Sequence, residues 1–425
     1  MKFAIETYGC QMNSADSELV SSLLRESGWE ETNDLSDADL VIFNTCSVRK
    51  HAEDRVLGRI SNEKHRKSTK PGMKIAVIGC MAQRMGKRLW EIESGIDYIV
   101  GVDQYNDLPH ILAEDFGCST EFDSRQLYVN IDPQHSNNTC AFVTVMRGCD
   151  NFCSYCIVPY VRGRERSIPF DQVYKEVERC GELGMKEVTL LGQNVNSYKY
   201  ADYDFPKLLK ELAQIESIHR LRFITSHPKD LSEDLIRVMA SEARVCEHIH
   251  LPMQSGDDAV LQAMNRKYGY SEYLDKVYKL RNAMPGIAIT TDLIAGFPGE
   301  TDEMFERTLD AIRQIQFDYA FCFKYSERSG TKAAELREQV PEQQRLKRLQ
   351  RMIDLQREIT LRKFSSKIGQ DVEVYVENIS KKSKRKVTGK TRDFKIAVVT
   401  GDAHDIGKLK TARVVDATAG TLICE

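Results

Sequence analysis

Short apolar runs alternate with helical patterns through the first third of the chain. Three apolar runs predict buried strands at 3–7, 40–43 and 74–78. The segments between them show the periodicity of helices at 17–27 and 52–64. Because strands that alternate with helices form parallel sheets, this pattern predicts an α/β domain with a doubly wound parallel sheet. We place this domain at residues 1–118.

The same alternation returns in the central region. Six apolar runs lie at 143–146, 187–191, 221–224, 248–251, 288–294 and 319–323. Six strands with helices between them predict a partial (β/α)6 barrel of the TIM type, at residues 135–363. In such barrels the chemistry lies on the loops that follow the strands, so functional side chains are expected there.

The last part of the chain changes to a period of two. A basic helical pattern starts at Pro341 and ends near Lys363, which predicts a connecting helix. Beyond it, alternating runs lie at 372–377, 386–390, 395–399 and 410–415. Short alternating strands separated by turn residues predict a small antiparallel β-barrel of OB-like size, at residues 366–425.

The composition is that of a globular protein. Of 425 residues, 41% are hydrophobic and 29% are charged, and no run of about 18 apolar residues is present. The start of the sequence lacks the apolar segment of a signal peptide. We therefore predict a cytoplasmic protein with no membrane partner. Twelve cysteines in such a protein favour metal or redox chemistry over disulfides.

The net charge of −3 conceals an uneven distribution. Residues 366–425 carry 12 Lys and Arg against 8 Asp and Glu. Residues 342–363 carry 7 basic side chains against 3 acidic ones. A basic C-terminal part on an otherwise acidic chain favours a polyanionic partner.

The loop at residues 147–159 contains the loop cysteines, Cys149, Cys153 and Cys156, with three and then two residues between them. A [4Fe-4S] cluster normally has four Cys ligands, so a set of three leaves one iron able to bind a ligand from outside the protein. The spacing therefore predicts a reactive cluster, with these residues as metal ligands and catalytic residues. The alternative is a zinc knuckle, which needs a fourth Cys or His at short spacing.

A second group of cysteines follows three predicted strands. These strand-end cysteines are Cys10, Cys46 and Cys80. Because ligands of an open α/β sheet bind beyond the carboxyl ends of its strands, the three thiols should converge there as a second cluster site. Gly9 and Gly79 would allow a close approach of the backbone. The alternative is three separate buried cysteines. We expect core or surface roles for Cys118, Cys140, Cys180, Cys246, Cys322 and Cys424.

The cysteine motifs resemble those of a known family. The loop cysteines, with Tyr155 before the third, resemble the signature of the radical S-adenosylmethionine (radical SAM) superfamily. Residues 6–13 (ETYGCQMN), 16–18 (DSE), 44–49 (NTCSVR) and 79–83 (GCMAQ) resemble the methylthiotransferases, in the branch that acts on N6-isopentenyladenosine of tRNA. The resemblance covers essentially the whole chain.

This resemblance implies a division of labour between two [4Fe-4S] clusters. The cluster on the loop cysteines would bind SAM and, once reduced by an electron donor such as a flavodoxin or ferredoxin system, cleave it to a 5′-deoxyadenosyl radical. The auxiliary cluster on the strand-end cysteines would carry a sulfur that a first SAM methylates. The radical from a second SAM would remove hydrogen from C2 of the isopentenyl(dimethylallyl)adenosine next to the tRNA anticodon, where the methylated sulfur would add.

Small polar residues after the barrel strands are candidates for the SAM site. By position we assign Gln193, Ser226, Gln254 and Asp292, although loop hydrogen bonds are an alternative role for each. The resemblance of the cysteine loop adds Tyr155 to these candidates. Three arginines that follow the loop could meet phosphates or the SAM carboxylate, or lie in solvent; they are Arg162, Arg164 and Arg166. His248 and His250 share one side of a strand, but no third metal ligand is evident.

The C-terminal module resembles the TRAM domain, an RNA-binding barrel of tRNA-modifying enzymes. We assign its basic side chains to RNA binding: Lys381, Lys382, Lys384, Arg385, Lys390 and Arg392. A solvated turn is the alternative for the loop among them. Aromatic residues for base stacking are limited to Tyr375 and Phe394. We therefore expect recognition of the backbone and shape of a folded RNA such as an anticodon stem-loop.

Two other hypotheses for the function are compatible with the sequence. One is methylthiolation of threonylcarbamoyl-adenosine in tRNA, or of an aspartate in a ribosomal protein. The other, of a different class, is an iron–sulfur protein that binds RNA and senses redox state without catalysis. SAM-dependent formation of 5′-deoxyadenosine separates the catalytic readings from the redox sensor.

Overall fold

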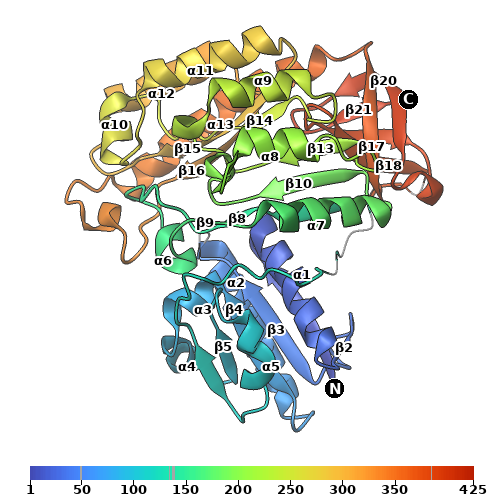
Figure 1. The fold of residues 1–425 in the computed structure, drawn as a ribbon. Helices are drawn as coiled ribbons and strands as arrows, with labels where there is room; N and C mark the ends of the chain where they lie inside the picture. The colour runs from blue at the N-terminus through green and yellow to red at the C-terminus, as the bar shows by residue number, and fades with distance from the viewer. Residues whose placement is uncertain (48–49, 134, 136–138, 384) are drawn as a thin grey trace.

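The chain folds into an N-terminal α/β domain, a central partial barrel and a C-terminal closed β-barrel (Figure 1). The computed structural model describes residues 1–47, 50–133, 135, 139–383 and 385–425. Val48 and Arg49 of the second cysteine motif, and the RNA-binding candidate Lys384, lie outside the described residues. Among the helices of the described residues, none combines the length and the apolar character needed to cross a membrane.

The N-terminal domain has a six-stranded sheet whose paired strands are all parallel, in the order β2-β1-β3-β4-β5-β6. Its strands are β1 (Lys2–Tyr8), β2 (Glu30–Glu31), β3 (Leu40–Thr45), β4 (Lys74–Gly79), β5 (Tyr98–Val100) and β6 (Gly117–Ser119). Helix α1 (Gln11–Glu26) packs on one face of the sheet, and α2 (Lys50–Lys67), α3 (Cys80–Met85) and α4 (Arg88–Ile92) pack on the other. The doubly wound prediction is confirmed.

The side chains of β3 point alternately to the two faces of the sheet, and helices cover both faces. Leu40 and Ile42 contact the α1 side, whereas Val41 and Phe43 contact the α2 side, so every residue of the strand is buried. A continuous apolar run is typical of such a parallel strand. The sheet also contains β2, β5 and β6, which the sequence pattern missed because they have only two or three residues each.

The central domain has six parallel strands, as predicted. They are β7 (Cys140–Thr144), β10 (Glu187–Leu191), β13 (Arg220–Phe223), β14 (His248–His250), β15 (Ala288–Ala295) and β16 (Tyr319–Lys324). The first three pair in one sheet and the last three in another. A parallel bridge between Leu221 and Val245 joins the two halves. The result is an open barrel rather than a closed one.

Helices cover the outside of this partial barrel (Figure 1). The larger ones are α7 (Phe170–Glu182), α8 (Phe205–Leu212), α9 (Glu233–Ser241), α11 (Tyr270–Ala283), α12 (Asp302–Ile315) and α13 (Glu342–Ser365). The first strand begins and ends earlier than its predicted range of 143–146. Residues Met146–Arg147 instead form β8, which pairs in antiparallel fashion with β9 (Arg166–Ser167).

The C-terminal domain is a closed five-stranded barrel in the order β17-β18-β19-β21-β20. Its strands are β17 (Asp371–Ile379), β18 (Lys386–Thr391), β19 (Ile396–Thr400), β20 (Leu409–Ala417) and β21 (Leu422–Cys424). Five strands in a closed barrel agree with the OB-like prediction. One detail differs, because β19 and β21 pair in parallel and thereby close the barrel. Sequence patterns missed β21, which has three residues.

This C-terminal barrel docks on the N-terminal ends of the central strands. At the start of β13, Arg220 donates to Lys390 O at 2.7 Å and Arg222 donates to Thr391 O at 2.7 Å. Phe394 stacks on His248, the first residue of β14, with 4.4 Å between ring centroids. The loops that follow the strands lie at the opposite end of the barrel, where its chemistry is expected.

Candidate active site

The strand-end cysteines converge at the carboxyl edge of the N-terminal sheet. Cys10 precedes α1, Cys46 follows β3, and Cys80 begins α3. A hydrogen bond with the Cys46 thiol is the largest cause that lowers the pKa of Cys10 to about 5, and the charge of Arg162 adds to it. Burial raises the pKa of Cys80, and the charge of the nearby Cys10 raises it further. The three thiols therefore share one site.

Two buried asparagines hold the first two of these loops together. Asn13 Oδ1 accepts a hydrogen bond from the Cys10 amide at 3.3 Å. Asn13 Nδ2 donates to Asn44 Oδ1 at 3.0 Å, and Asn44 Nδ2 donates to Asn13 O at 2.8 Å. Both asparagines stand in the motifs that carried the family resemblance, yet sequence reasoning gave them no role. The sequence signal that could have identified them is that each stands within three residues of a strand-end cysteine.

Gly9 and Gly79 leave the space into which the neighbouring strand ends pack. A Cβ atom on Gly79 would lie 2.5 Å from Asn44 Oδ1 and 2.8 Å from Thr45 O, and the φ of Gly79 is +91°. A Cβ atom on Gly9 would lie 2.9 Å from Cys46 Cβ. Glycine is therefore required at these positions for the cysteine loops to approach one another.

The loop cysteines lie after β8 at the carboxyl end of the central barrel, and Cys149 and Cys153 are buried. Burial is the main cause that raises the pKa of Cys149 to about 11 and that of Cys156 to about 12. The charge of Cys153 also raises both pKa values. Asn151 Nδ2 donates to Cys149 Sγ at 3.5 Å. Arg266 Nη1 donates to Cys153 Sγ at 3.4 Å. Burial favours neutral thiols, whereas these two donors would stabilise the thiolate form that binds a metal.

The segment after α10 (Asp258–Ala263) anchors this loop. Ser154 donates through its amide to Met264 O at 3.0 Å and through its hydroxyl to Ala263 O at 2.8 Å. Asn265 Nδ2 donates to Phe152 O at 2.9 Å. Sequence reasoning missed Asn265 and Arg266, because no motif marks a residue that contacts the loop from more than 100 positions away.

Buried charges connect the two cysteine sites. Arg162 donates through Nε to Cys80 Sγ at 3.2 Å and through Nη2 to Asp16 Oδ2 at 2.7 Å. Arg147 donates to the other oxygen of Asp16 at 2.9 Å. Ile157, which follows the last loop cysteine, packs in one apolar cluster with Cys80. The two sites are therefore neighbours across the junction of the first two domains.

The other two arginines after the loop are also paired. Arg166 forms a salt bridge at 3.0 Å with Asp103 of the N-terminal domain. Arg164 is exposed and pairs with Asp150 at 2.7 Å. The structure therefore uses Arg162 and Arg166 to hold the N-terminal domain, a role that the sequence did not indicate for either.

Three of the five SAM candidates have buried oxygens without a hydrogen-bond partner within the described part of the chain. These atoms are Gln193 Oε1, Ser226 Oγ and Gln254 Oε1. They follow β10, β13 and β14, which are consecutive in the barrel. Such atoms fit a polar ligand, because buried polar groups without partners are costly.

The remaining two candidates are placed differently. Tyr155 packs edge-to-face on Phe297, with ring centroids 6.5 Å apart. Asp292 lies on β15, and its carboxylate is 3.4 Å from His250 Nε2. His248 and His250 both contact Thr290 Oγ1 at 3.0 Å. Among the described residues, the one close group of possible metal ligands is Cys140, Glu187 and Glu377.

The two carboxylates of this group each form an ion pair with a basic side chain, so a metal ion is not needed to balance their charge. Glu187 is 3.0 Å from Arg222, and Glu377 is 2.7 Å from Lys390. Arg392 similarly donates to Glu247 at 2.8 Å. Two of the RNA-binding candidates, Lys390 and Arg392, thus have their charges paired within the protein.

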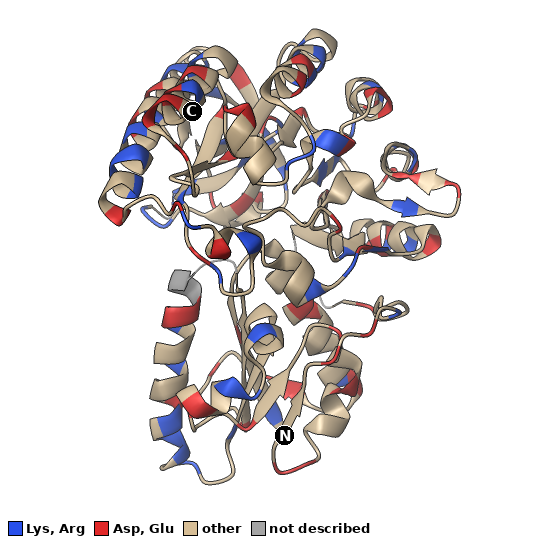
Figure 2. Ribbon diagram, turned by 90° about the vertical axis from the view of Figure 1, so that its left-hand side faces the viewer, with Lys and Arg blue, Asp and Glu red and all other residues tan. Residues whose placement is uncertain are grey.

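The other RNA-binding candidates that the structure describes lie in the turn between β17 and β18. Lys381, Lys382 and Arg385 are exposed. Tyr375 and Phe394, the two aromatic candidates, pack against the central domain instead: Tyr375 donates to Thr139 O at 2.7 Å, and Phe394 stacks on His248. On the face that Figure 2 shows, basic and acidic residues are mixed along the helices and do not form a single stripe.

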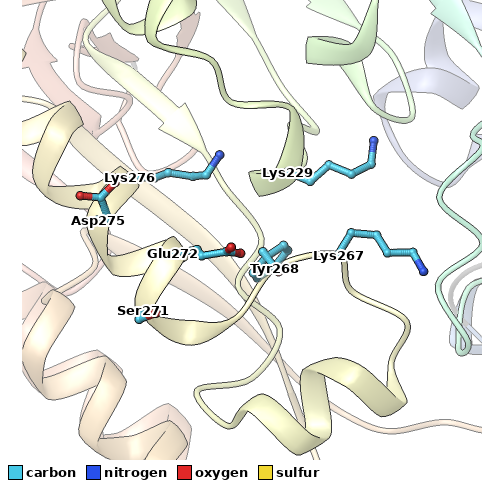
Figure 3. A pocket seen from close by; sticks show the side chains of 7 residues that line it. All are labelled: Lys229, Lys267, Tyr268, Ser271, Glu272, Asp275 and Lys276. Atoms are coloured by element: carbon cyan, nitrogen blue, oxygen red, sulfur yellow. The ribbon is translucent and has the colours of Figure 1, made fainter.

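A pocket of about 600 Å³ lies at the rim of the barrel, near the anchor of the cluster loop. Lys229 and Lys267 extend on one side of it, and Lys276 and Asp275 lie on the other (Figure 3). Its Tyr268 accepts a hydrogen bond from Arg266 at 2.9 Å, the arginine that contacts Cys153. The pocket mixes three lysines with two carboxylates.

Comparison with known proteins identifies the family. The model described as Radical SAM superfamily matches residues 143–312, and that described as Uncharacterized protein family UPF0004 matches residues 2–101. A tRNA-2-methylthio-N(6)-dimethylallyladenosine synthase from Thermoanaerobacter sp. strain X514 is 44% identical over 99% of this chain and 91% of its own. The chain belongs to the radical SAM methylthiotransferases, in the family of these synthases.

A second synthase agrees with this membership of the methylthiotransferases, and a solved structure shares the fold. A synthase of the same name from Thermodesulfovibrio yellowstonii is 45% identical over 96% of this chain and 95% of its own. The radical SAM methyltransferase TsrM from Kitasatospora setae, solved with cobalamin and a [4Fe-4S] cluster, has a TM-score of 0.63 at 14% identity. That likeness covers 78% of this methylthiotransferase and 77% of TsrM, and it concerns the fold alone.

Proposed function

We propose that this chain transfers a methylthio group to C2 of N6-isopentenyl(dimethylallyl)adenosine next to the anticodon of tRNA. Full-length relatives with this activity in their names, at 42–45% identity, support the proposal. The observation that carries it is the adjacency of two three-thiol sites, bridged by Arg162, which reaches Cys80 Sγ from the segment that follows the loop cysteines. One thiol site alone would not distinguish this chemistry from other radical SAM reactions.

The residues present fit two [4Fe-4S] clusters. Cys149, Cys153 and Cys156 would hold the cluster that binds SAM, and Cys10, Cys46 and Cys80 would hold the auxiliary one. Each set offers three thiols and at least one hydrogen-bond donor to sulfur. When bound, these groups and SAM supply a 5′-deoxyadenosyl radical and a methylated sulfur, which general acids and bases cannot provide for an unactivated C–H bond.

The side chains of the barrel would orient SAM. Gln193, Ser226 and Gln254 offer the unpaired buried oxygens described above, so we assign them the polar contacts. Tyr155 stays a candidate for SAM, and Asp292 is a candidate for a contact with either SAM or the substrate base. Ile157, Val161, Val102 and Cys80 form an apolar cluster between the two thiol sites. This cluster would exclude water from the path between them.

We assign the RNA phosphates to the turn between β17 and β18. Within the described residues, the side chains of Lys381, Lys382 and Arg385 form no ion pair, so their charges are free to neutralise phosphates. Lys390 and Arg392 are left out of this surface because Glu377 and Glu247 neutralise them. Contacts of this kind position an RNA without reading its bases.

The reductant and the compartment follow from the same chemistry. We propose an electron donor of the flavodoxin or ferredoxin class, since SAM cleavage requires one electron. All twelve cysteines are free of disulfides, which fits a reducing compartment such as the cytoplasm.

Anaerobic reconstitution followed by an assay with SAM, a reductant and an isopentenyladenosine stem-loop tests this function. The expected result is about eight irons per chain, 5′-deoxyadenosine and a methylthio product. Cys46→Ala should keep 5′-deoxyadenosine formation but lose the product, whereas Cys149→Ala should lose both. Absence of 5′-deoxyadenosine from fully loaded, reduced protein would support the redox-sensor reading. Product on a threonylcarbamoyl stem-loop or a ribosomal protein, and none on the isopentenyl one, would support the sister activities.

A further inference from the structure

A row of three aromatic side chains lies open on the last strand of the barrel. Tyr319, Phe321 and Phe323 on β16 are 42%, 42% and 40% exposed. The residues between them, Ala320 and Cys322, pack in the core beneath the outer helices. Because side chains alternate along a strand, the three rings face the inside of the open barrel. Three large rings exposed side by side are unusual unless they bind something.

The pairing of the strands shows what lies beside this row. Tyr319 is opposite Thr290, and Phe321 is opposite Asp292 on β15. The rings of Tyr319 and Phe321 are 5.0 Å apart, and Phe321 contacts the His250 ring at 5.9 Å. These contacts fix the Tyr319 and Phe321 rings in place although both rings stay partly exposed, so this part of the row is a preformed surface.

The carboxyl end of β16 lies between the two cysteine sites. Tyr325, which follows the strand, contacts Phe297 at 5.5 Å, and Phe297 contacts Tyr155 beside the last loop cysteine. Further along, the charge of Arg328 interacts with Glu53 and Cys46 of the N-terminal domain. A molecule on the aromatic row would therefore extend toward both three-thiol sites.

The charge beside the row limits what can bind there. Among the described inward-facing positions of β14, β15 and β16, Asp292 provides the one carboxylate. The Nε2 atom of the His250 ring lies 3.4 Å from this carboxylate. An acidic, aromatic surface accepts an N–H donor on a planar ring and repels an anion.

We propose that Tyr319, Phe321 and Phe323 bind the isopentenylated adenine and, with Asp292, select it over the threonylcarbamoyl form. This proposal rests on the function proposed above. The base and its branched chain pack on the rings, and Asp292 accepts a hydrogen bond from the N6–H group. A threonylcarbamoyl group would bring its own carboxylate toward Asp292, which costs binding energy for that substrate.

The proposal is tested by equilibrium binding of three anticodon stem-loops that carry adenosine, isopentenyladenosine or threonylcarbamoyladenosine. The full-length protein is used without SAM, so that the readout is binding and not turnover. We expect at least about tenfold tighter binding of the isopentenyl form than of the unmodified one. Phe321→Ala should reduce this preference to less than about threefold, because it weakens binding of the isopentenyl stem-loop more than that of the unmodified one. Phe321→Leu, which keeps apolar volume, should give an intermediate value.

Phe116→Ala is the matched control, because Phe116 is an exposed phenylalanine on the N-terminal domain. It should keep the full preference. Asp292→Asn should improve binding of the threonylcarbamoyl form by about tenfold relative to the isopentenyl form, since it removes one like charge. Thermal unfolding of each variant verifies that it is folded.

Failure of this inference and failure of the proposed function are distinguishable. If the wild type forms the methylthio product but Phe321→Ala and Phe321→Leu both keep the full isopentenyl preference, the aromatic row is not the binding surface. An unchanged threonylcarbamoyl affinity in Asp292→Asn would remove Asp292 from the selection. If the wild type forms no product and does not prefer the isopentenyl stem-loop, the function itself falls.

Discussion

At the scale of single residues, the junction of the first two domains depends on Asp16. Its carboxylate is fully buried between Arg147 and Arg162, and the Arg147 guanidinium lies 4.6 Å over the Tyr128 ring. A buried ion pair adds little net stability compared with apolar packing, but loss of one partner leaves the others charged without compensation. Removal of Asp16 would leave two such charges.

We therefore predict that Asp16→Asn lowers the free energy of unfolding of the apo protein by about 3–5 kcal/mol. Urea unfolding under anaerobic conditions measures this change. Asp150→Asn is the control, because its pair with Arg164 is exposed and should contribute less than about 1 kcal/mol. Equal, small effects of both variants would contradict the role of Asp16.

Gly79 gives a second prediction at this scale. In Gly79→Ala, the added Cβ would meet Asn44 Oδ1 and the Thr45 carbonyl, in a backbone conformation that disfavours any side chain. We expect the strand-end cysteines to separate and the iron content after reconstitution to fall from about eight to about four per chain. Iron and sulfide analysis measures it.

Gly58→Ala is the control for this change. Gly58 lies within α2 with open space around its Cα, so alanine there should leave the iron content unchanged. If Gly79→Ala retained about eight irons per chain, the close approach at Gly79 would not be needed for the auxiliary site.

At the scale of elements, the turn between β18 and β19 joins two domains. Phe394 stacks on His248 and lies beneath the charged ends of Arg222 and Lys390. In the same turn, Lys395 reaches Asp318, the residue before β16, at 3.2 Å. A turn that resembled an RNA-binding surface in sequence therefore holds the C-terminal barrel on the central one.

Phe394→Ala should weaken this docking. The loss of stacking and apolar contact should lower the free energy of unfolding by about 1–3 kcal/mol and make the segment before β17 more sensitive to limited proteolysis. Ile396→Ala is the control, because Ile396 is exposed on the C-terminal barrel. Identical proteolysis of the wild type and both variants would show that other contacts, such as those of Arg220, suffice for docking.

At the scale of the whole molecule, the central barrel separates two tasks. The loop cysteines lie at the carboxyl end of this barrel, beside the strand-end cysteines of the N-terminal sheet. The C-terminal barrel lies at the amino ends of the central strands (Figure 1). The exposed side chains of Lys381, Lys382 and Arg385 lie on the C-terminal barrel, away from the thiol sites. An RNA that uses both would contact the protein at two separate places.

The salt dependence of RNA binding tests this separation. Replacement of Lys381, Lys382 and Arg385 by Gln should reduce the slope of log affinity against log salt concentration by about 2–3. The preference for isopentenyladenosine should stay the same, since it arises elsewhere. Arg392→Gln should leave the slope unchanged, because Glu247 already pairs with Arg392. A slope that changed only in Arg392→Gln would contradict this assignment.

The sequence predicted those features that depend on local pattern. The alternation of apolar segments was enough to predict the architecture of each of the three domains. The position of Cys10, Cys46 and Cys80 after parallel strands was enough to predict that their thiols lie together. Strands as short as β5 and β21 show no period and were missed. In these cases the pairing with neighbouring strands, and not the local sequence, determines the conformation.

Features that depend on distant partners were not predictable. Asp16 pairs with Arg147 and Arg162 across 131 and 146 positions. Lys390 and Arg392 resembled RNA-binding residues because their local sequence is basic, but Glu377 and Glu247 lie beside them in the fold. Charge patterns in a sequence indicate a surface only where folding does not supply a partner.

The bridge formed by Arg162 has one more consequence. Since the same guanidinium contacts a sulfur of one domain and belongs to the segment that follows the thiols of the other, it acts as a spacer of fixed length between the two three-thiol sites. Any rigid-body movement that widened the gap would first have to separate a buried cation from the Asp16 carboxylate and the Cys80 sulfur. The separation of the two thiol sites is thus set in part by the length of one arginine side chain.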